Sequence, residues 1–212
     1  MGAAIGIAVA AFLTRMTLGT AHAHADLPWL VAPLGASAVL VFAVPASPLA
    51  QPWAVIGGNL ISATIGITTG LWLGLHLGLP VLAASLAVGA AIAVMITCRC
   101  LHPPGGACAL LCALGAGMQG WSFTHLLPIL ANVLALALIG WIFNTLTGHP
   151  WPHRHAPVSP TPPTPSAHHT RQDIEDVLAD WNEVLDVDVD DLDAFYQALE
   201  RHVASRKAGG DR

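Results

Sequence analysis

Charged side chains are almost missing from residues 1–148 of this sequence, where only Arg15, Asp26 and Arg99 carry a full charge. A soluble domain of this length needs a charged face toward water, so its absence excludes a soluble globular fold for this part of the chain. The net charge of −5 belongs to the remaining tail, and an acidic balance excludes a basic surface for nucleic acid. The apolar start of the chain lacks a basic leader, which argues against a cleavable signal peptide.

Carboxylates are scarcer still, since Asp26 is the one acidic residue before residue 149. An enzyme site needs a nucleophile, a base and an acid held in place, so we expect no enzymatic activity. Four cysteines surround one polar stretch, at positions Cys98, Cys100, Cys108 and Cys112. Their spacing fits no recognised zinc or iron–sulfur pattern, so we expect space-filling thiols, no metal site and no cofactor. A soft-metal site, or a cysteine paired with His102 as a nucleophile, is the alternative interpretation.

Long apolar runs are what the sequence does have. Six apolar segments can be drawn, over residues 3–18, 29–44, 53–75, 80–97, 104–118 and 125–146. A membrane-spanning helix needs about 20 residues, and the second and fifth segments are shorter than that. Both short segments begin at prolines and are rich in glycine and alanine. The sequence therefore predicts an all-α, polytopic membrane protein with two short, broken helices.

The two short segments resemble each other, since Pro33–Leu40 and Pro104–Leu111 match at five of eight positions. Each follows a longer apolar run and precedes a segment with one early asparagine, Asn59 or Asn132. This order predicts a duplicated unit of three helices. Three crossings per unit would place the two copies in opposite orientations, as in the inverted repeats of many transporters. If the short segments are re-entrant instead, four full spans remain.

Glycines in the third segment are spaced for close packing. Gly66 and Gly70 have the four-residue spacing that lets two helix backbones approach each other. The run Gly57-Gly58-Asn59 leaves one face of its helix almost bare except for the amide. We expect these glycines to serve helix packing.

The stretch from Arg99 to Ala107 gathers an arginine, a histidine, two prolines and two glycines in an otherwise apolar region. Such a polar group inside a membrane segment indicates a functional site. The prolines end one helix and suit the first turn of the next, whose free N–H groups favour an anion. We predict anion-binding backbone at two helix starts, formed by Gly105, Gly106 and Ala107 and by Gly35, Ala36 and Ser37.

Four further side chains are candidates for this site: Arg99, His102, Asn59 and Asn132. His102 can donate to an anion or carry a proton; alternatively, its ring caps the preceding helix or fixes the Pro-Pro turn. Arg99 supplies a positive charge to the anion or contacts lipid phosphates at the interface. Asn59 and Asn132 occupy corresponding places in the two units, and an amide in a membrane needs either the ligand or a neighbouring helix as its partner.

These motifs carry a family resemblance over residues 1–148. The stretches that carry it are Arg99–Ala107, Pro33–Ala38, Gln51-Pro52-Trp53, Gly57-Gly58-Asn59 and Asn144–Gly148. In this order they resemble the HPP family of integral membrane proteins, which is named for its His-Pro-Pro motif. The resemblance implies an association with nitrite transport, as in plastid and cyanobacterial members. It also implies a link to regulation, since some bacterial members continue into a pair of cystathionine-β-synthase-type domains and the tail here is similar to their helical lead-in.

The chain changes character after residue 148. Residues 149–170 hold seven prolines together with Ser, Thr and His, which predicts an extended linker. Residues 171–212 are acidic, and the capping box from Thr170 to Asp173 predicts a helix with Ile174, Val177 and Trp181 on one face. A second amphipathic helix is expected to follow, so that the tail forms a soluble helical hairpin that packs on itself or on a second subunit.

Two functional hypotheses follow. The first is a transporter or channel for a small inorganic anion, nitrite first, which binds between the two broken helices. The second is a non-transporting membrane sensor or assembly module, in which the polar stretch locks helix packing and the tail binds a partner. Basic residues after the last span place the C-terminus in the cytoplasm of a bacterial inner membrane. We expect the protein to contact the lipid bilayer and to form a homo-oligomer through its membrane helices and its C-terminal helices.

Overall fold

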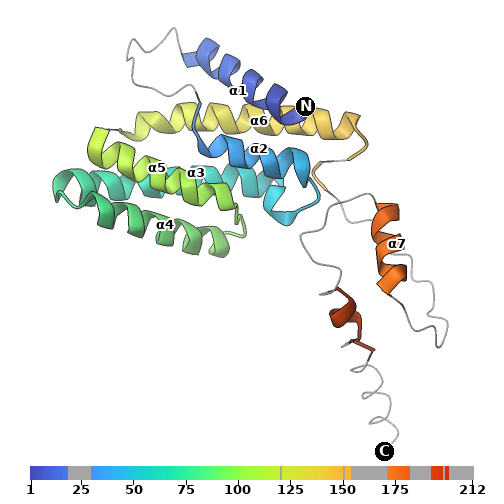
Figure 1. Ribbon diagram of the computed structural model, residues 1–212. Helices are drawn as coiled ribbons and strands as arrows, with labels where there is room; N and C mark the ends of the chain where they lie inside the picture. The colour runs from blue at the N-terminus through green and yellow to red at the C-terminus, as the bar shows by residue number, and fades with distance from the viewer. Residues whose placement is uncertain are drawn as a thin grey trace, which may run out of the picture. The chain divides into compact units, whose positions relative to one another are not determined.

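The computed structural model describes residues 1–18, 30–119, 121–149, 151–153, 171–181, 192–197 and 199–200. Within these ranges every regular element is a helix, which confirms the predicted all-α class. The chain divides into two compact units, Met1–Arg154 and His155–Arg212. The first unit is a helical bundle (Figure 1).

In its described residues the bundle contains six helices and three short helical turns. The helices are α1 (Gly2–Leu18), α2 (Pro33–Ala43), α3 (Pro52–Thr69), α4 (Pro80–Thr97), α5 (Pro103–Gln119) and α6 (Leu126–Leu146). The turns are η1 (Pro48–Ala50), the π-helical η2 (Gly70–His76), which continues α3, and η3 (Phe123–His125). Four helices begin at a proline, because proline has no N–H to leave unsatisfied and its φ is already helical. The six predicted segments are all observed.

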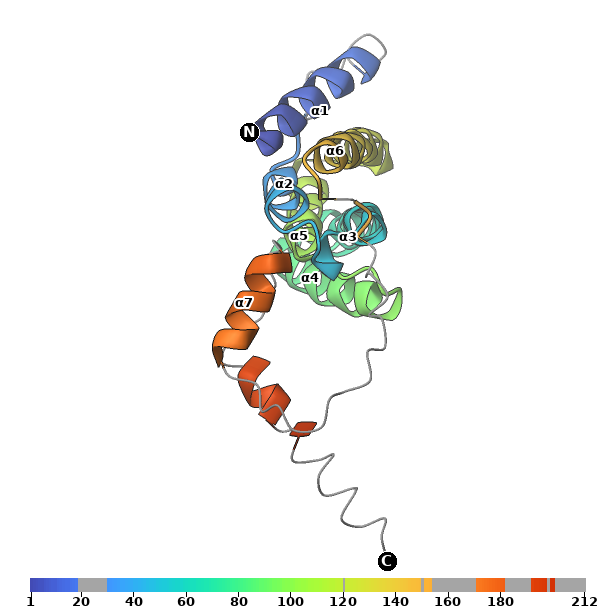
Figure 2. The same cartoon turned by 90° about the vertical axis from the view of Figure 1, so that its right-hand side faces the viewer.

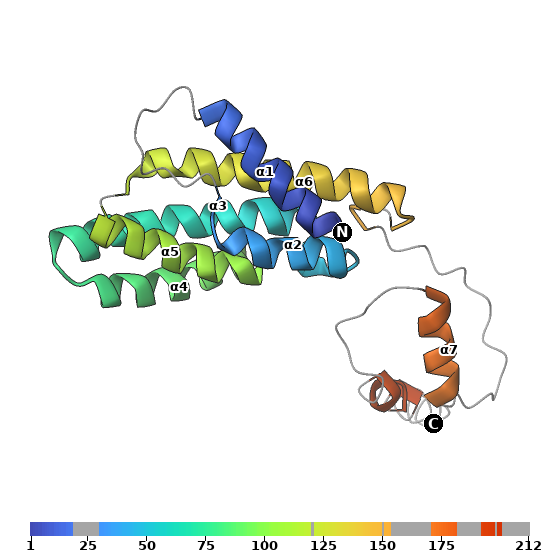
Figure 3. The same cartoon turned by 45° about the horizontal axis from the view of Figure 1, so that its top comes forward.

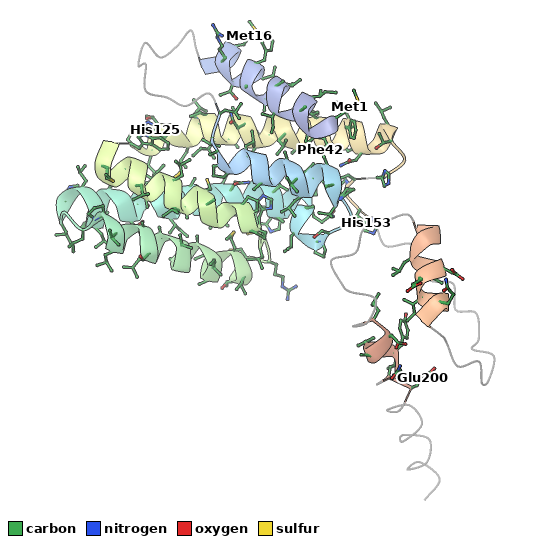
Figure 4. All side chains as sticks on the ribbon, in the orientation of Figure 1. Met1, Met16, Phe42, His125, His153 and Glu200 are labelled. Carbon is green, nitrogen blue, oxygen red and sulfur yellow. The ribbon has the colours of Figure 1, made fainter. Side chains whose placement is uncertain are left out.

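Among the residues that the structure describes, three helices are long and apolar enough to cross a membrane, namely Pro52–His76, Pro80–Thr97 and Phe123–Leu146. The side chains that project from the outside of this bundle are almost all carbon (Figure 4). Val81 and Trp72, for example, are 78% and 72% exposed. With 11 residues, α2 is about 16 Å long at the usual helical rise, about half of a bilayer's hydrocarbon core. The chain is thus a polytopic membrane protein with short helices inside its bundle.

The helix pairings repeat between the two halves of the bundle. In the predicted duplication, α1, α2 and α3 correspond to α4, α5 and α6. Helix α1 packs on α6, and its counterpart α4 packs on α3, the counterpart of α6. Figure 2 shows α1 and α4 at opposite edges, with α2 and α5 between them. This arrangement supports the predicted duplication.

Burial of the two short helices repeats as well. Residues 31–41 and 102–112 show the same succession of buried, half-buried and exposed positions, residue by residue. Val41 and Cys112 correspond in this register, and each lies against a glycine from the other group of three helices. A Cβ on Gly140 would contact Val41, and a Cβ on Gly66 would contact Cys112. The likeness between the two short segments is therefore a likeness of environment and not of composition alone.

The second unit contains α7 (Arg171–Trp181) and helical residues at 192–197 and 199–200. Both lie where the sequence predicts amphipathic helices. Ile174 of the predicted apolar face is buried, whereas Val177 is exposed. Thr170 of the predicted capping box, the turn of the predicted hairpin, and the linker beyond residue 153 lie outside the described residues.

Candidate functional site

The polar stretch begins with a sharp turn at the end of α4. Arg99 has φ of 52°, and the N–H of Cys100 donates to the Met95 carbonyl at 2.9 Å. This is the bonding of a Schellman cap, whose left-handed position usually holds glycine because a side chain is disfavoured there. The turn brings His102 inward just before Pro103 starts α5. The Arg99 side chain itself is exposed.

His102 is fully buried and both of its ring nitrogens have partners. Nε2 lies 2.8 Å from the Ser37 hydroxyl of α2, and Nδ1 lies 2.8 Å from the Leu49 carbonyl of η1. A carbonyl can only accept, so Nδ1 carries the hydrogen. In the neutral ring Nε2 is then an acceptor, and the Ser37 hydroxyl donates to it.

Asn59 of α3 extends this arrangement. Its Nδ2 donates to the Ser37 oxygen at 3.3 Å and to the Val55 carbonyl at 2.9 Å. Asn59, Ser37, His102 and the Leu49 carbonyl therefore form one line of hydrogen bonds, called here the Asn59–His102 chain. The chain links α3, α2, the start of α5 and η1. Its three side chains are buried, although the surrounding bundle is apolar.

The two short helices meet at this chain. Figure 3 shows their N-terminal ends next to each other, with α2 and α5 leading away in opposite directions. Ser37 lies in the second turn of α2, and its contact with His102 joins the two helix starts. The sequence predicts that the two broken helices meet, and in the structure they do.

Glycines seat the start of α5 on α3. A Cβ added to Gly58 would lie 2.5 Å from the His102 Cβ, and one added to Gly105 would lie 3.1 Å from the Gly58 carbonyl oxygen. A Cβ at either position would force neighbouring atoms to move. Gly58 and Gly105 therefore serve the close packing that places His102 against α3. A packing role was expected for Gly58, whereas Gly105 was expected to bind an anion.

The backbone amides of Gly35 and Gly105 are not free. The Gly35 N–H donates to the Ala32 carbonyl at 3.1 Å, and the Gly105 N–H donates to the His102 carbonyl at 2.8 Å. The prediction that these two amides are open to an anion is wrong. At Gly35 the reason is that the chain already turns before Pro33, as the helical φ of −53° and ψ of −39° at Ala32 show, so a carbonyl lies within reach.

Other predicted positions remain open on one side. A Cβ added to Gly35 or Gly106 would meet nothing within 4 Å. Ala36 and Ala107 are exposed. These four residues form matching surfaces at the starts of the two short helices.

Asn132 lies in a separate polar cluster. Its Oδ1 accepts from the Val31 N–H at 3.2 Å, and its Nδ2 donates to the Thr14 hydroxyl at 2.6 Å. It thereby joins α6 to α1 and to the start of α2. These bonds of Asn132 run to Val31 and Thr14, whereas the Asn59–His102 chain runs through Ser37 and Leu49.

Replacing Asn132 with alanine is expected to destabilise the bundle. The change leaves the buried Thr14 hydroxyl and the Val31 N–H without this partner, which costs about 1–3 kcal/mol for an unsatisfied buried group. The thermal unfolding midpoint of the detergent-solubilised protein should fall. Thr68→Ala is the matched control, because the exposed Thr68 hydroxyl bonds only within its own helix; an equal midpoint in both variants would contradict the role given to Asn132.

Sequence reasoning missed the turn that holds Leu49. The Gln51 amide donates to the carbonyls of Pro45 and Ser47 at 2.9 Å each, and its oxygen accepts from the His153 N–H at 2.9 Å. His153 is labelled in Figure 4. Trp151 donates to the Ala50 carbonyl at 3.0 Å, so the segment after α6 closes over η1. The Gln-Pro-Trp motif was the available signal for this turn.

The cysteines lie around the site without forming it. Cys100, Cys108 and Cys112 are buried, and Cys98 is exposed. The Cys108 thiol donates to the Asn59 carbonyl at 3.7 Å. The thiols therefore pack between α3, α5 and the turn after α4.

Comparison with known proteins gives one family and two relatives. Residues 1–152 match the family described as "HPP, transmembrane region". Two transmembrane proteins of Dictyostelium discoideum are each 35% identical to this chain, over 121 residues (57% of this chain and 42% of the relative) and over 142 residues (66% and 44%). The chain thus matches less than half the length of these relatives. No solved structure matches.

Proposed function

This chain belongs to the HPP transmembrane family, and from that premise we propose that it is a transporter or channel for a small inorganic anion, with nitrite as the first substrate to test. The resemblance of its motifs to those of nitrite-associated members favours nitrite. We place it in a bacterial inner membrane with its C-terminus in the cytoplasm, because basic residues follow the last helix.

The observation that carries this proposal is the Asn59–His102 chain. Amide, hydroxyl and imidazole groups lie together in an apolar bundle, where a dehydrated anion needs hydrogen-bond donors in place of water. The described residues of the first unit hold no carboxylate. The described part of this region therefore carries no fixed negative charge that would repel an anion.

The two short helices add to this preference. Both direct their N-terminal ends toward the Asn59–His102 chain, and each end carries a partial positive charge from the aligned peptide dipoles. Because Gly35 and Gly105 use their amides within the first turn, the proposed binding rests on the side chains of Ser37, Asn59 and His102. Gly35 and Gly106, at which an added Cβ would meet nothing within 4 Å, lie at the starts of the same two helices.

Nitrite flux into proteoliposomes tests the proposal. We expect flux that exceeds that of chloride and nitrate, and we expect Gly106→Val to abolish it, because the valine fills the open space at the start of α5. Gly89→Val is the matched control: Gly89 lies within α4, and a Cβ there also meets nothing within 4 Å. Equal flux in the two variants, or no flux in the unaltered protein, would count against this site.

One observation favours the second hypothesis, a sensor or assembly module. No buried side-chain nitrogen or oxygen lacks a partner among the described residues, so the Asn59–His102 chain is satisfied without a ligand and is able to lock the helices together. In that case the unaltered protein shows no flux, and a chain ending at residue 153 loses a cytosolic partner that the full chain keeps.

A further inference from the structure

We propose that His102 couples anion movement to protons, with one proton bound for each anion, so that the pair crosses without net charge. This inference rests on the proposed function and specifies how the same site works. It is drawn from the direction of the hydrogen bonds in the Asn59–His102 chain and from the charges around it.

With a neutral His102, the Ser37 hydroxyl is fully committed. It donates its hydrogen to Nε2 at 2.8 Å, because the single N–H hydrogen of the neutral ring is on Nδ1, which donates to the Leu49 carbonyl. Its oxygen accepts from Asn59. A hydroxyl has one hydrogen to donate, so in this state Ser37 has none left for an anion.

Protonation of His102 reverses one bond of the chain. A proton from the aqueous phase forms the Nε2–H bond, and Nε2 then donates to the Ser37 oxygen. That oxygen now accepts from both His102 and Asn59, so its own hydrogen must turn away from them. A hydroxyl donor therefore becomes available only in the protonated state, beside a new positive charge. When the anion leaves, the proton returns to water and the first arrangement is restored.

The charges around His102 determine what balances the imidazolium. Of the elements that contact it, α2, α3 and η1 contribute Ser37, Asn59 and the Leu49 carbonyl, none of which titrates in the neutral range. The other titratable or charged groups on neighbouring elements are the thiols of Cys98, Cys100, Cys108 and Cys112, the exposed guanidinium of Arg99, and His149 and His153 after α6.

None of these groups is a carboxylate, so within the described part of the first unit a protonated His102 has no counter-ion. An unpaired buried charge is strongly unfavourable, and an anion that enters with the proton removes this penalty. By thermodynamic reciprocity, each then favours the binding of the other by the same factor. In the proposed mechanism, the anion therefore serves as the counter-ion of the protonated His102.

Coupling is measured in proteoliposomes with a weakly buffered interior and an enclosed pH indicator. We expect nitrite influx to carry about one proton per anion, as linkage at a single site requires, and to be unaffected by a potassium diffusion potential set with valinomycin. Protein-free vesicles give the background from nitrous acid that crosses lipid unaided. Nitrite flux without proton movement overturns the coupling and leaves the proposed function intact, whereas the absence of protein-dependent flux overturns both.

A variant locates the coupling at His102. In His102→Gln the amide keeps hydrogen-bonding groups in the chain but does not titrate, so nitrite binding to the purified protein in unbuffered detergent solution should take up no proton. His76→Gln is the matched control, because His76 is exposed on η2 and bonds the Leu71 carbonyl; proton uptake should persist there. Proton uptake that persists in His102→Gln overturns the assignment.

A second variant covers the case in which His102→Gln does not fold. Ser37→Ala removes the hydroxyl that the proton redirects, so the tightening of nitrite binding at low pH should shrink by about tenfold, the effect of losing one hydrogen bond to a charged group. Ser85→Ala, which removes an exposed hydroxyl from α4, should keep the pH dependence. An unchanged pH dependence in Ser37→Ala overturns the proposed reorientation.

Discussion

Replacing His102 with alanine is expected to abolish nitrite flux and to lower the free energy of unfolding by about 2–5 kcal/mol, as for other truncations of large buried side chains. Flux is lost because the group that carries the proton and redirects Ser37 is gone. Stability is lost because the Leu49 carbonyl and the Ser37 hydroxyl lose their partner and a cavity opens at the start of α5. Initial rates per reconstituted protein and the thermal midpoint in detergent measure the two effects.

A second buried amide separates flux from stability. Asn144 donates to the Val41 carbonyl at 2.8 Å and joins α6 to α2 outside the Asn59–His102 chain. Asn144→Ala should therefore lower the thermal midpoint and leave flux per folded protein unchanged. If His102→Ala keeps flux while its stability falls, His102 is a packing group and the transport site lies elsewhere.

The helices were predictable from the sequence because local chemistry sets their ends. Proline lacks an N–H and fixes φ, so Pro33, Pro52 and Pro80 mark helix starts. The fourth predicted segment, residues 80–97, coincides with α4. The weak likeness between the two short segments also held information, since their burial repeats position by position. Local chemistry and internal likeness are both readable without knowledge of distant contacts.

The site was predictable only in part, for physical reasons. Polar side chains in an apolar bundle must find partners, which drew attention to Asn59 and His102, whereas Ser37 was included for its place at a helix start. Leu49 could not be found, because it acts through a carbonyl that every residue has. Asn132 was expected in the same site as Asn59, but spacing along a helix does not determine which neighbour an amide meets. Free amides at Gly35 and Gly105 were mispredicted because each N–H donates to the carbonyl three residues earlier, and that bond depends on backbone angles that the residue types alone do not fix.

The line of close approach between α3 and α5 is the feature most sensitive to added volume. A Cβ on Gly66 would run into the Ala109 carbonyl oxygen, and one on Gly70 would run into that of Ala113. The glycine spacing along α3 and its continuation η2 is thus matched by the spacing of the facing carbonyls along α5. These obstacles are backbone atoms, which cannot rotate away as a side chain would.

Valine at Gly66 or Gly70 is therefore expected to destabilise the bundle at or beyond the upper end of the usual range for overpacking, about 1–3 kcal/mol. The double variant should yield no folded protein on size-exclusion chromatography in detergent. Gly89→Ala is the matched control: the same bundle receives a Cβ where nothing lies within 4 Å, and the higher helix propensity of alanine should raise stability by about 0.5–1 kcal/mol. Because α5 begins with the residue after His102, separation of α3 from α5 should also remove nitrite flux. A double variant that folds and transports normally would show that the two backbones do not approach as closely as described.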